Sequence, residues 1–201
     1  MLVIFAHPAL YKSKINTELI KVVRDKEGVT FHDLYEAYPD FLIDIQKEQR
    51  LLLEHDVIVF QHPFYWYSSP AIIKEWEDLV LEFGFAYGHG GTALRGKKMM
   101  TAISAGGSHD SYGEGGIHNH KLTEFLKPFE QSAVLCGMEY LPPFVVHDAS
   151  TMKNSGDIAV YRDLYGRIIN ALRDGGIDYD ELRGTEYMND YFKEKSKSGS
   201  V

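Results

Sequence analysis

The 201-residue sequence predicts an α/β fold, a doubly wound five-stranded parallel sheet with helices on both faces. Short, continuous apolar runs alternate along the chain with amphipathic stretches of helical spacing. Runs such as Met1–Ala6 and Asp56–Gln61 do not alternate apolar with polar residues, which is typical of strands buried on both faces. Because crossovers between parallel strands are right-handed, a doubly wound sheet is the simplest topology for this order of elements.

Local signals mark where the helices between these strands begin or end. Ser13 and Asp44 precede amphipathic stretches and can cap them, because their side-chain oxygens accept hydrogen bonds from first-turn amides. Pro70 suits a first helical turn, where its missing N–H is not needed. Pro128 lies inside an apolar stripe and predicts a kink or a restart. Gly175-Gly176 ends the last amphipathic stretch.

The elements follow in a regular order. The expected strands are Met1–Ala6, Val29–Asp33, Asp56–Gln61, Lys97–Ser104 and Met138–Leu141, with Phe144–His147 extending or edging the last. The expected helices are one that begins after Ser13, then Asp44–His55, Pro70–Phe83, His118–Cys136 and Asp157–Leu172. Tyr35–Ile43 is expected to be a loop over the sheet edge.

The length suits a single domain, which we expect to cover residues 1–177. Residues 178–201 form a polar C-terminal tail, expected to be partly disordered, notably over Lys193–Val201, or packed on a partner subunit.

Composition excludes several classes of protein. A net charge of −8 argues against nucleic-acid binding, because phosphate binding needs a basic surface. The single Cys136 excludes an internal disulfide and fits a reducing compartment. No apolar run approaches the roughly 20 residues of a membrane-spanning helix, and the N-terminus lacks the basic segment of a signal peptide. We therefore expect a cytoplasmic protein.

Folds of this class bind ligands beyond the carboxyl ends of the strands, which selects residues 7–16, 61–69 and 104–118. The first segment offers His7, Ser13 and Asn16 around the start of a helix, where backbone amides can bind a phosphate. It lacks the Gly-x-Gly-x-x-Gly and Gly-Lys-Ser motifs of nucleotide-binding loops. Taken alone, it favours the simpler alternative, in which Ser13 only caps the helix and His7 fills a turn.

The second segment holds four consecutive aromatic residues, Phe64, Tyr65, Trp66 and Tyr67. They cannot all point into a core, so at least two face a crevice or an interface. Large flat side chains suit a planar heteroaromatic ligand. The alternatives are a dimer contact or a packed lid, but the place of the loop at the binding edge favours ligand contact.

The third segment is rich in glycine, which lets backbone amides approach a ligand closely. Its Tyr112 and His118 form a pair of donors on a rim that the neighbouring glycines allow to adjust. His118 and His120 do not indicate a metal site, because no carboxylate or cysteine supplies a further ligand at a recognisable spacing. We expect His120 to be a solvated residue of a first helical turn, and Cys136 to belong to the core rather than act as a nucleophile.

Several short motifs occur in order between residue 1 and about residue 147. They are Phe5-Ala-His7-Pro8, Asp33-Leu-Tyr35…Tyr38-Pro-Asp40-Phe41, Gln61-His62-Pro63…Trp66-Tyr67, Phe85-Ala-Tyr87-Gly88…Gly90-Gly91, Gly96-Lys97, Gly106-Gly107 and Cys136-Gly137…Leu141-Pro142-Pro143-Phe144. With this set the chain resembles the flavodoxin-like NAD(P)H:quinone oxidoreductases of the DT-diaphorase type. Within them it is most similar to the bacterial ancillary flavoproteins of glutathione-gated potassium-efflux systems.

The resemblance implies a flavodoxin-like sheet, a homodimer with the active site at the subunit interface, FMN or FAD as cofactor, and NAD(P)H as co-substrate. The similarity to the potassium-efflux branch favours FMN over FAD. The residues that would bind the flavin phosphate are His7, Ser13, Lys14, Ile15 and Asn16. The residues that would contact the isoalloxazine ring are Phe64, Tyr65, Trp66 and Tyr67, with Ser104, Ala105, Gly106 and Gly107 at its polar edge. Relatives commonly carry Thr or Gly in place of Ala105, whose backbone amide could still serve.

Tyr112 and His118 match the pair that assists hydride transfer in the quinone reductases. The expected activity is a two-electron ping-pong transfer from NAD(P)H through the flavin to a quinone or another small electrophilic acceptor. The efflux branch often lacks the tyrosine, so Tyr112 favours the reductase. The alternative is a regulatory flavoprotein that binds a potassium-efflux transporter, which would place it at the inner face of the membrane. Two less favoured hypotheses are a flavodoxin-like electron carrier and, more distant still, a metal hydrolase that uses His109, His118 and His120.

Overall fold

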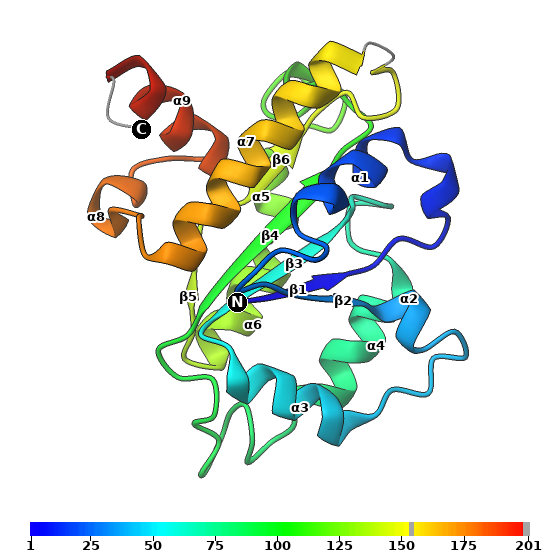
Figure 1. Ribbon diagram of the computed structural model, residues 1–201, viewed down its shortest axis with the longest axis vertical. Helices are drawn as coiled ribbons and strands as arrows, with labels where there is room; N and C mark the ends of the chain where they lie inside the picture. Colours follow the sequence, from blue (N-terminus) through cyan, green and yellow to red (C-terminus); the bar gives the residue numbers. More distant parts are fainter. Residues whose placement is uncertain (153–154, 199–201) are drawn as a thin grey trace.

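The computed structural model describes residues 1–152 and 155–198. Its centre is a parallel sheet with the strand order β2-β1-β3-β4-β5, and β6 also pairs with β4 (Figure 1). The strands are β1 (Leu2–Phe5), β2 (Thr30–Asp33), β3 (Val57–Pro63), β4 (Lys98–Ser104), β5 (Glu139–Tyr140) and β6 (Phe144–Val146). The expected doubly wound parallel sheet with helices around it is confirmed.

The fifth position of the sheet is shared by two short strands. β5 pairs with Lys98 and Met99 near the start of β4, whereas β6 pairs with Ala102–Ser104 at its end. Pro142-Pro143 lies between them, and proline has no N–H to donate to a ladder. The prediction that Phe144–His147 extends the last strand is therefore confirmed, with an interruption that the prolines impose.

Helices cover both faces of the sheet (Figure 1). They are α1 (Lys14–Leu19), α2 (Leu34–Ala37), α3 (Ile45–Glu54), α4 (Ala71–Val80), α5 (Leu122–Phe125), α6 (Lys127–Leu135), α7 (Ser155–Asp174), α8 (Tyr179–Leu182) and α9 (Met188–Ser198). Apolar residues of α2 to α6 pack in one buried cluster, and those of α1 and α7 to α9 pack in another. No helix among the described residues is long and apolar enough to cross a membrane.

The predicted caps are confirmed. The Ser13 side chain accepts a hydrogen bond from the Asn16 amide, and the Asp44 side chain accepts one from the Lys47 amide. The expected restart near Pro128 is also confirmed, since α5 ends at Phe125 and α6 begins at Lys127 with the proline in its first turn.

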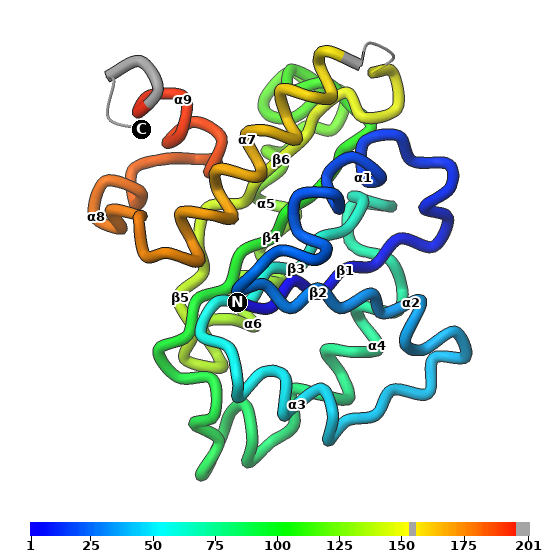
Figure 2. The backbone as a smooth tube through the Cα atoms, in the orientation of Figure 1, coloured from blue at the N-terminus to red at the C-terminus, as the bar shows by residue number. Residues whose placement is uncertain are grey.

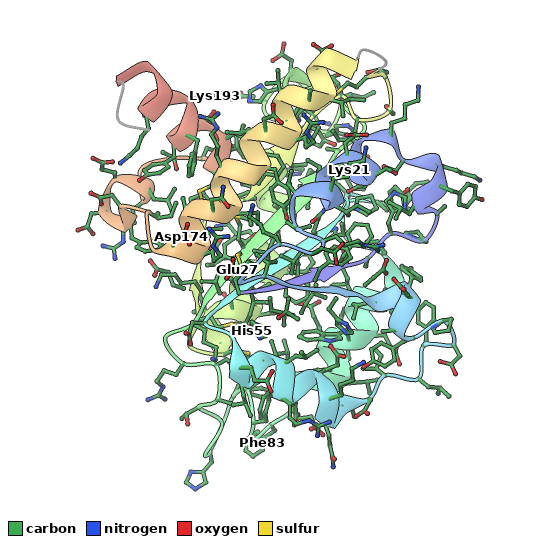
Figure 3. All side chains as sticks on the ribbon, viewed as in Figure 1. Lys21, Glu27, His55, Phe83, Asp174 and Lys193 are labelled. Atoms are coloured by element: carbon green, nitrogen blue, oxygen red, sulfur yellow. The ribbon has the colours of Figure 1, made fainter. Side chains whose placement is uncertain are left out.

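Two expectations about helices are wrong. Tyr35–Ile43 does not begin as a loop, because the Asp33 carboxylate accepts hydrogen bonds from the Tyr35 and Glu36 amides and starts α2. α4 ends at Val80, so Phe83 does not belong to its buried stripe and is 68% exposed. Figure 3 shows Phe83 at the end of the molecule that lies beyond α3, where the chain leads into the amino end of β4.

The C-terminal segment was expected to be a partly disordered tail, but residues 179–198 contain two helices that pack on their own chain. Leu182, Met188 and Tyr191 are buried in the cluster formed with α1 and α7. The tube in Figure 2 shows α7 crossing the sheet and the chain then returning through α8 to α9. The helix α9 continues to Ser198, and residues 199–201 of the expected disordered stretch lie outside the described part of the chain.

Candidate active site

A hollow of about 460 Å³ lies at the carboxyl edge of the sheet, where β1, β3, β4 and β6 end. All three loops selected from the sequence contribute to its wall. The lining residues are His7, Lys12, Ser13, Lys14, Ile15, Asn16, Pro63, Phe64, Tyr65, Ser104, Gly106, Ala149, Ser150 and Met152. The volume is in the range of small-molecule sites.

The loop after β1 is ordered by its own polar side chains. The Nδ1 atom of His7 accepts a hydrogen bond from the Ala9 amide at 3.1 Å, and Ser13 caps α1. Burial lowers the pKa of His7 below its usual value, so the ring is neutral near pH 7. The helix cap and the filled turn are therefore both present, and the same two residues also line the hollow.

Asn16 connects this loop to the end of β4. Its Nδ2 group donates to Ser13 Oγ at 3.0 Å and to Ser104 Oγ at 2.8 Å. The side chain is 1% exposed, and its Oδ1 atom is buried with no hydrogen-bond partner in the protein. Because buried polar atoms are nearly always paired, this oxygen is available to a donor on a bound ligand.

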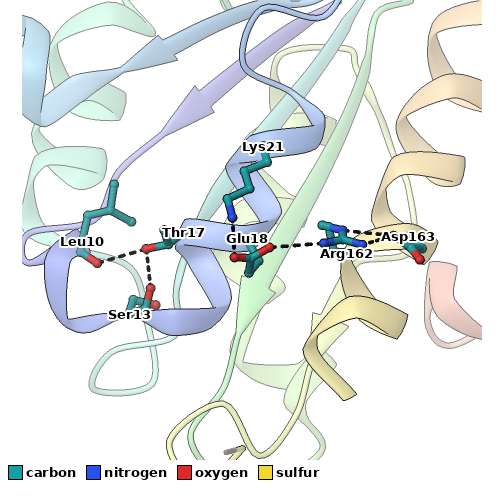
Figure 4. Close-up of polar contacts among 7 residues, drawn as sticks. All are labelled: Leu10, Ser13, Thr17, Glu18, Lys21, Arg162 and Asp163. Carbon is teal, nitrogen blue, oxygen red and sulfur yellow. Dashed lines mark hydrogen bonds and ion pairs between the residues drawn. The ribbon is translucent and has the colours of Figure 1, made fainter. Parts of the chain in front are cut away.

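A second hollow of about 520 Å³ meets the first at Ser13 and Lys14 and extends between α1 and α7. Figure 4 shows its polar contacts, in which Glu18 lies between Lys21 of the α1 region and Arg162 of α7. The Nη1 atom of Arg162 lies 3.3 Å from Glu18 Oε2. Lys14 and Arg162 line this second hollow, where Arg162 is paired with Glu18.

The aromatic loop after β3 contributes only two of its four rings to the hollow. Phe64 and Tyr65 line it, whereas Tyr67 does not and Trp66 is 94% exposed. Trp66 and Tyr67 have φ angles of 50° and 62°, in a left-handed turn that is closed by hydrogen bonds between Tyr65 and Ser68. Trp66 and Tyr67 therefore lie outside the wall that Phe64 and Tyr65 form, and their contact with an isoalloxazine ring stays a prediction.

Ala105 does not offer its amide to a ligand. Its N–H donates to the Val146 carbonyl at 2.8 Å, and its carbonyl accepts from the Ala149 amide at 2.9 Å. A backbone N–H has one hydrogen to donate, so the expected contact of this amide with a ligand is contradicted. Gly106 lines the hollow, and Gly107 does not.

Residues 149–152 were missed by sequence reasoning. Ala149, Ser150 and Met152 line the hollow, and Ser150 Oγ donates to the Gly106 carbonyl at 2.8 Å. The sequence does carry a signal for these residues, because it predicts Phe144–His147 as a strand. In a parallel sheet the residues that follow such a strand reach the same edge as the other ligand-binding loops.

Tyr112 and His118 lie together beside the hollow. Their rings stack with centroids 4.5 Å apart, and Tyr67 Oη lies 3.3 Å from His118 Nδ1. Phe64 connects this pair to the hollow, with its ring centroid 6.2 Å from that of Tyr112. Burial raises the pKa of Tyr112, so its hydroxyl keeps its proton at neutral pH.

The turn that joins these two residues is closed by its backbone. The His118 amide donates to the Ser111 carbonyl at 3.0 Å. A Cβ atom on Gly116 would lie 2.5 Å from that same oxygen, so only glycine fits here. The stacking of Tyr112 on His118 therefore depends on this tight turn.

The remaining candidate residues lie apart from the hollow. His120 is exposed near Glu124 and precedes α5. Cys136 is buried at the end of α6, which confirms its place in the core. Among the described residues, no group of three or more His, Cys, Asp or Glu side chains could hold a metal ion.

The chain belongs to the flavodoxin-like fold family, whose pattern matches residues 1–168. Two curated bacterial relatives are similar over most of their length. An uncharacterised NAD(P)H oxidoreductase, YrkL of Bacillus subtilis (strain 168), is 49% identical over 143 residues, which cover 71% of this chain and 82% of that protein. The glutathione-regulated potassium-efflux system ancillary protein KefG of Serratia proteamaculans (strain 568) is 47% identical over 153 residues, with 76% and 84% covered.

Two solved structures show the same arrangement. The general stress protein 14 of Treponema denticola in complex with FMN has a TM-score of 0.78 and 35% identity, covering 87% of this chain and 97% of that chain. An NADPH-quinone reductase from P. pentosaceus has a TM-score of 0.74 and 31% identity, covering 83% and 95%.

Proposed function

We propose that this protein is an FMN-dependent NAD(P)H:quinone oxidoreductase. The observation that carries the proposal is the Tyr112–His118 pair beside a hollow of about 460 Å³ at the carboxyl edge of the sheet. The relatives named as an NAD(P)H oxidoreductase and an NADPH-quinone reductase support the reaction. The FMN complex of a structural relative supports the cofactor.

The side chains that line the hollow offer groups that suit each part of FMN. Lys12 and Lys14 supply positive charge for a phosphate, next to the hydroxyl of Ser13. The unpartnered Oδ1 atom of Asn16 suits a ribityl hydroxyl, which can donate a hydrogen bond. Phe64 and Tyr65 supply aromatic surface for the ring system. FAD would additionally need to place its adenylate group, and the adjoining hollow that ends at Arg162 is the space for it.

When bound, the flavin would supply the group that accepts a hydride from NAD(P)H and passes it to the quinone. The protein's part in the reaction is binding, orientation and proton transfer. Reduction of a quinone to a hydroquinone consumes one hydride and one proton. Tyr112 and His118 can donate hydrogen bonds to the quinone oxygens and supply that proton, which is the role of positioned general acids.

The first test is to purify the protein, record its absorbance spectrum and identify any released flavin. A yellow protein that releases FMN and is bleached by NADH or NADPH supports the proposal, and a protein that binds neither FMN nor FAD contradicts it. In the second test, His118→Ala should lower turnover with a quinone by about 10²-fold or less, because the flavin supplies most of the rate. Unchanged kinetics would remove His118 from the mechanism.

We expect the working form to be a homodimer. Trp66 and Ile117, with 94% and 81% exposed side chains, lie on the two loops that hold Tyr67 and His118. Exposed large apolar side chains grouped next to a site are typical of an interface. Light scattering after gel filtration would give twice the chain mass, and a monomer at micromolar concentration would contradict the expectation.

A regulatory role is the second candidate function, favoured by the 47% identity to a potassium-efflux ancillary protein. In that role the protein would bind a membrane transporter, and its reductase activity would be incidental. Co-expression with an efflux transporter in potassium-loaded cells that are moved to potassium-free medium would distinguish the two. A change in efflux that a Tyr112→Phe, His118→Ala variant retains supports regulation independent of catalysis.

A further inference from the structure

His147 is a buried histidine that the reaction proposed above does not use. It follows β6, its side chain is 8% exposed, and both ring nitrogens are buried without a hydrogen-bond partner. A buried polar group without a partner destabilises the fold, because it has given up its hydrogen bonds to water. An apolar ring of the same size would fill the space at lower cost, so packing alone does not account for the imidazole.

The ring of His147 lies against the proposed proton donor. Its centroid is 5.9 Å from that of Tyr112, 5.2 Å from that of His109 and 5.8 Å from that of Tyr187. Tyr112 in turn stacks on His118 at 4.5 Å. Tyr112 is therefore in contact with two imidazoles, one at the substrate rim and one in the protein interior.

The backbone around His147 is held on both sides. The Val146 carbonyl accepts from the Ala105 amide, and the Asp148 amide donates to the Gly107 carbonyl at 3.0 Å. Two residues before His147, both backbone groups of Val145 are hydrogen-bonded to the side chain of Asn189 in α9. Because the backbone around it is fixed by hydrogen bonds, the His147 ring can hold the Tyr112 side chain in one position.

The charge state of His147 suits a hydrogen-bonding role. Burial, followed by the nearby His109, lowers the pKa of His147 to about 4, against the opposing influences of Asp148 and of the Gly107 backbone next to the ring. Lys193 of the C-terminal helix acts in the same direction as His109, and the phenols of Tyr112 and Tyr187 complete the groups that face the ring. At neutral pH the imidazole is neutral, with one N–H donor and one acceptor nitrogen.

We propose that His147 is a positioning residue for Tyr112, with a ring nitrogen that holds the Tyr112 hydroxyl through one bridging water, in the direction in which it gives its proton to the acceptor. This inference rests on the proposed quinone reductase function. His147 itself touches neither the flavin nor the quinone in this scheme, and it acts through Tyr112.

The kinetic test compares two substitutions in the FMN-loaded protein. His147→Phe keeps a ring and removes the nitrogens, whereas His147→Gln keeps an amide within reach of the Nε2 position. We expect His147→Phe to slow reoxidation by quinone about 10-fold, with the reduction by NAD(P)H unchanged, and His147→Gln to stay within about 3-fold of the parent.

In a Tyr112→Phe background, His147→Phe should have no further effect. A full rate in His147→Phe, equal losses in both variants, or an additive loss in the double variant would each overturn the inference.

A second readout does not depend on the flavin. In protein with ¹³C-labelled tyrosine rings, the Tyr112 Cζ resonance, identified by its loss in Tyr112→Phe, reports hydrogen bonding of the phenol oxygen. It should shift in His147→Phe and return in His147→Gln, and His89→Phe, a change in the exposed turn at the opposite edge of the sheet, should leave it in place. A resonance that does not move, or that Gln fails to restore, contradicts the contact.

These measurements separate the two proposals. A protein that takes up no flavin defeats the proposed function, while the spectrum still decides whether His147 holds Tyr112. If His147→Phe does not fold, as judged by circular dichroism, His147→Leu replaces it in both comparisons.

Discussion

The side-chain amide of Asn189 makes both of its hydrogen bonds to the backbone of Val145, at the outer edge of the sheet. Its Oδ1 atom accepts from the Val145 amide and its Nδ2 group donates to the Val145 carbonyl, each at 2.9 Å. A neighbouring strand would occupy these same two groups. Asn189 therefore closes the open edge of β6 and attaches the C-terminal helix to the sheet.

Removing this amide should destabilise the protein. In Asn189→Leu two buried backbone groups lose their partners, and we expect the free energy of unfolding to fall by about 2–4 kcal/mol. Urea denaturation followed by circular dichroism measures the change. Asn170→Ala, a half-buried asparagine of α7, is the matched control and should change stability by less than about 0.5 kcal/mol. Equal stability of both variants would show that the amide contributes nothing.

Substitution of Glu48 should lower the free energy of unfolding strongly. Its carboxylate is fully buried and accepts hydrogen bonds from His32, Tyr38 and Trp76. Burial alone would raise the pKa of Glu48, but these three donors lower it, so the group is ionised at neutral pH.

Glu48→Leu leaves these three donors unpaired, and we expect a loss of about 3–5 kcal/mol in unfolding free energy. Glu54→Gln, an exposed change on the same helix, should have little effect. Trp76 fluorescence in a urea titration follows both variants. A loss below about 1 kcal/mol in Glu48→Leu would mean that the network is energetically neutral.

Acid should destabilise the protein through His62. This ring is fully buried against Phe129, and burial lowers its pKa to about 4. Between the unfolded pKa near 6.5 and about pH 4, the unfolded chain binds the proton that the folded chain excludes, so stability falls as the pH is lowered. His62 contributes up to about 3 kcal/mol to this loss.

Unfolding free energies of the flavin-free protein at pH 7, 6 and 5 test this expectation. His62→Asn, which can keep a donor toward the Pro63 carbonyl, should be less stable at pH 7 but show a flatter pH dependence. His89→Asn should keep the parent's slope, because that side chain is exposed. An unchanged slope in His62→Asn would mean that other groups govern the acid response.

Substitution of Lys14 should weaken the binding of FMN but not of riboflavin, which has no phosphate. It lies where the two hollows meet and its side chain is exposed, so its contribution to stability is small. Lys14→Gln is expected to weaken FMN binding about 10-fold by loss of one charge-assisted contact to the phosphate, and to leave riboflavin binding unchanged. Fluorescence titration with each flavin measures the effect.

The control for this prediction is Lys26→Gln. Lys26 lies before β2, at the opposite edge of the sheet from the hollow, and its substitution should affect neither flavin. Equal weakening of FMN and riboflavin by Lys14→Gln would place the phosphate elsewhere.

Local patterns of residues predict the order of the strands and helices along the chain, the caps at Ser13 and Asp44, and the three loops that reach the carboxyl edge. Each of these depends on signals within a few residues, such as an apolar run, a capping oxygen or a proline. The loops could be grouped because parallel strands deliver their ends to a common edge, whatever the details of the turns.

Which atoms in those loops remain free for a ligand depends on the tertiary contacts of the folded chain. The Ala105 amide is taken by Val146, forty-one residues later in the chain, and a left-handed turn directs Trp66 away from the hollow. The C-terminal helices are polar overall, yet they are held because Asn189 binds an unpaired strand edge and because Leu182, Met188 and Tyr191 are buried in a core cluster. Such outcomes depend on hydrogen-bond partners that are distant in sequence, and no local pattern of residues records them.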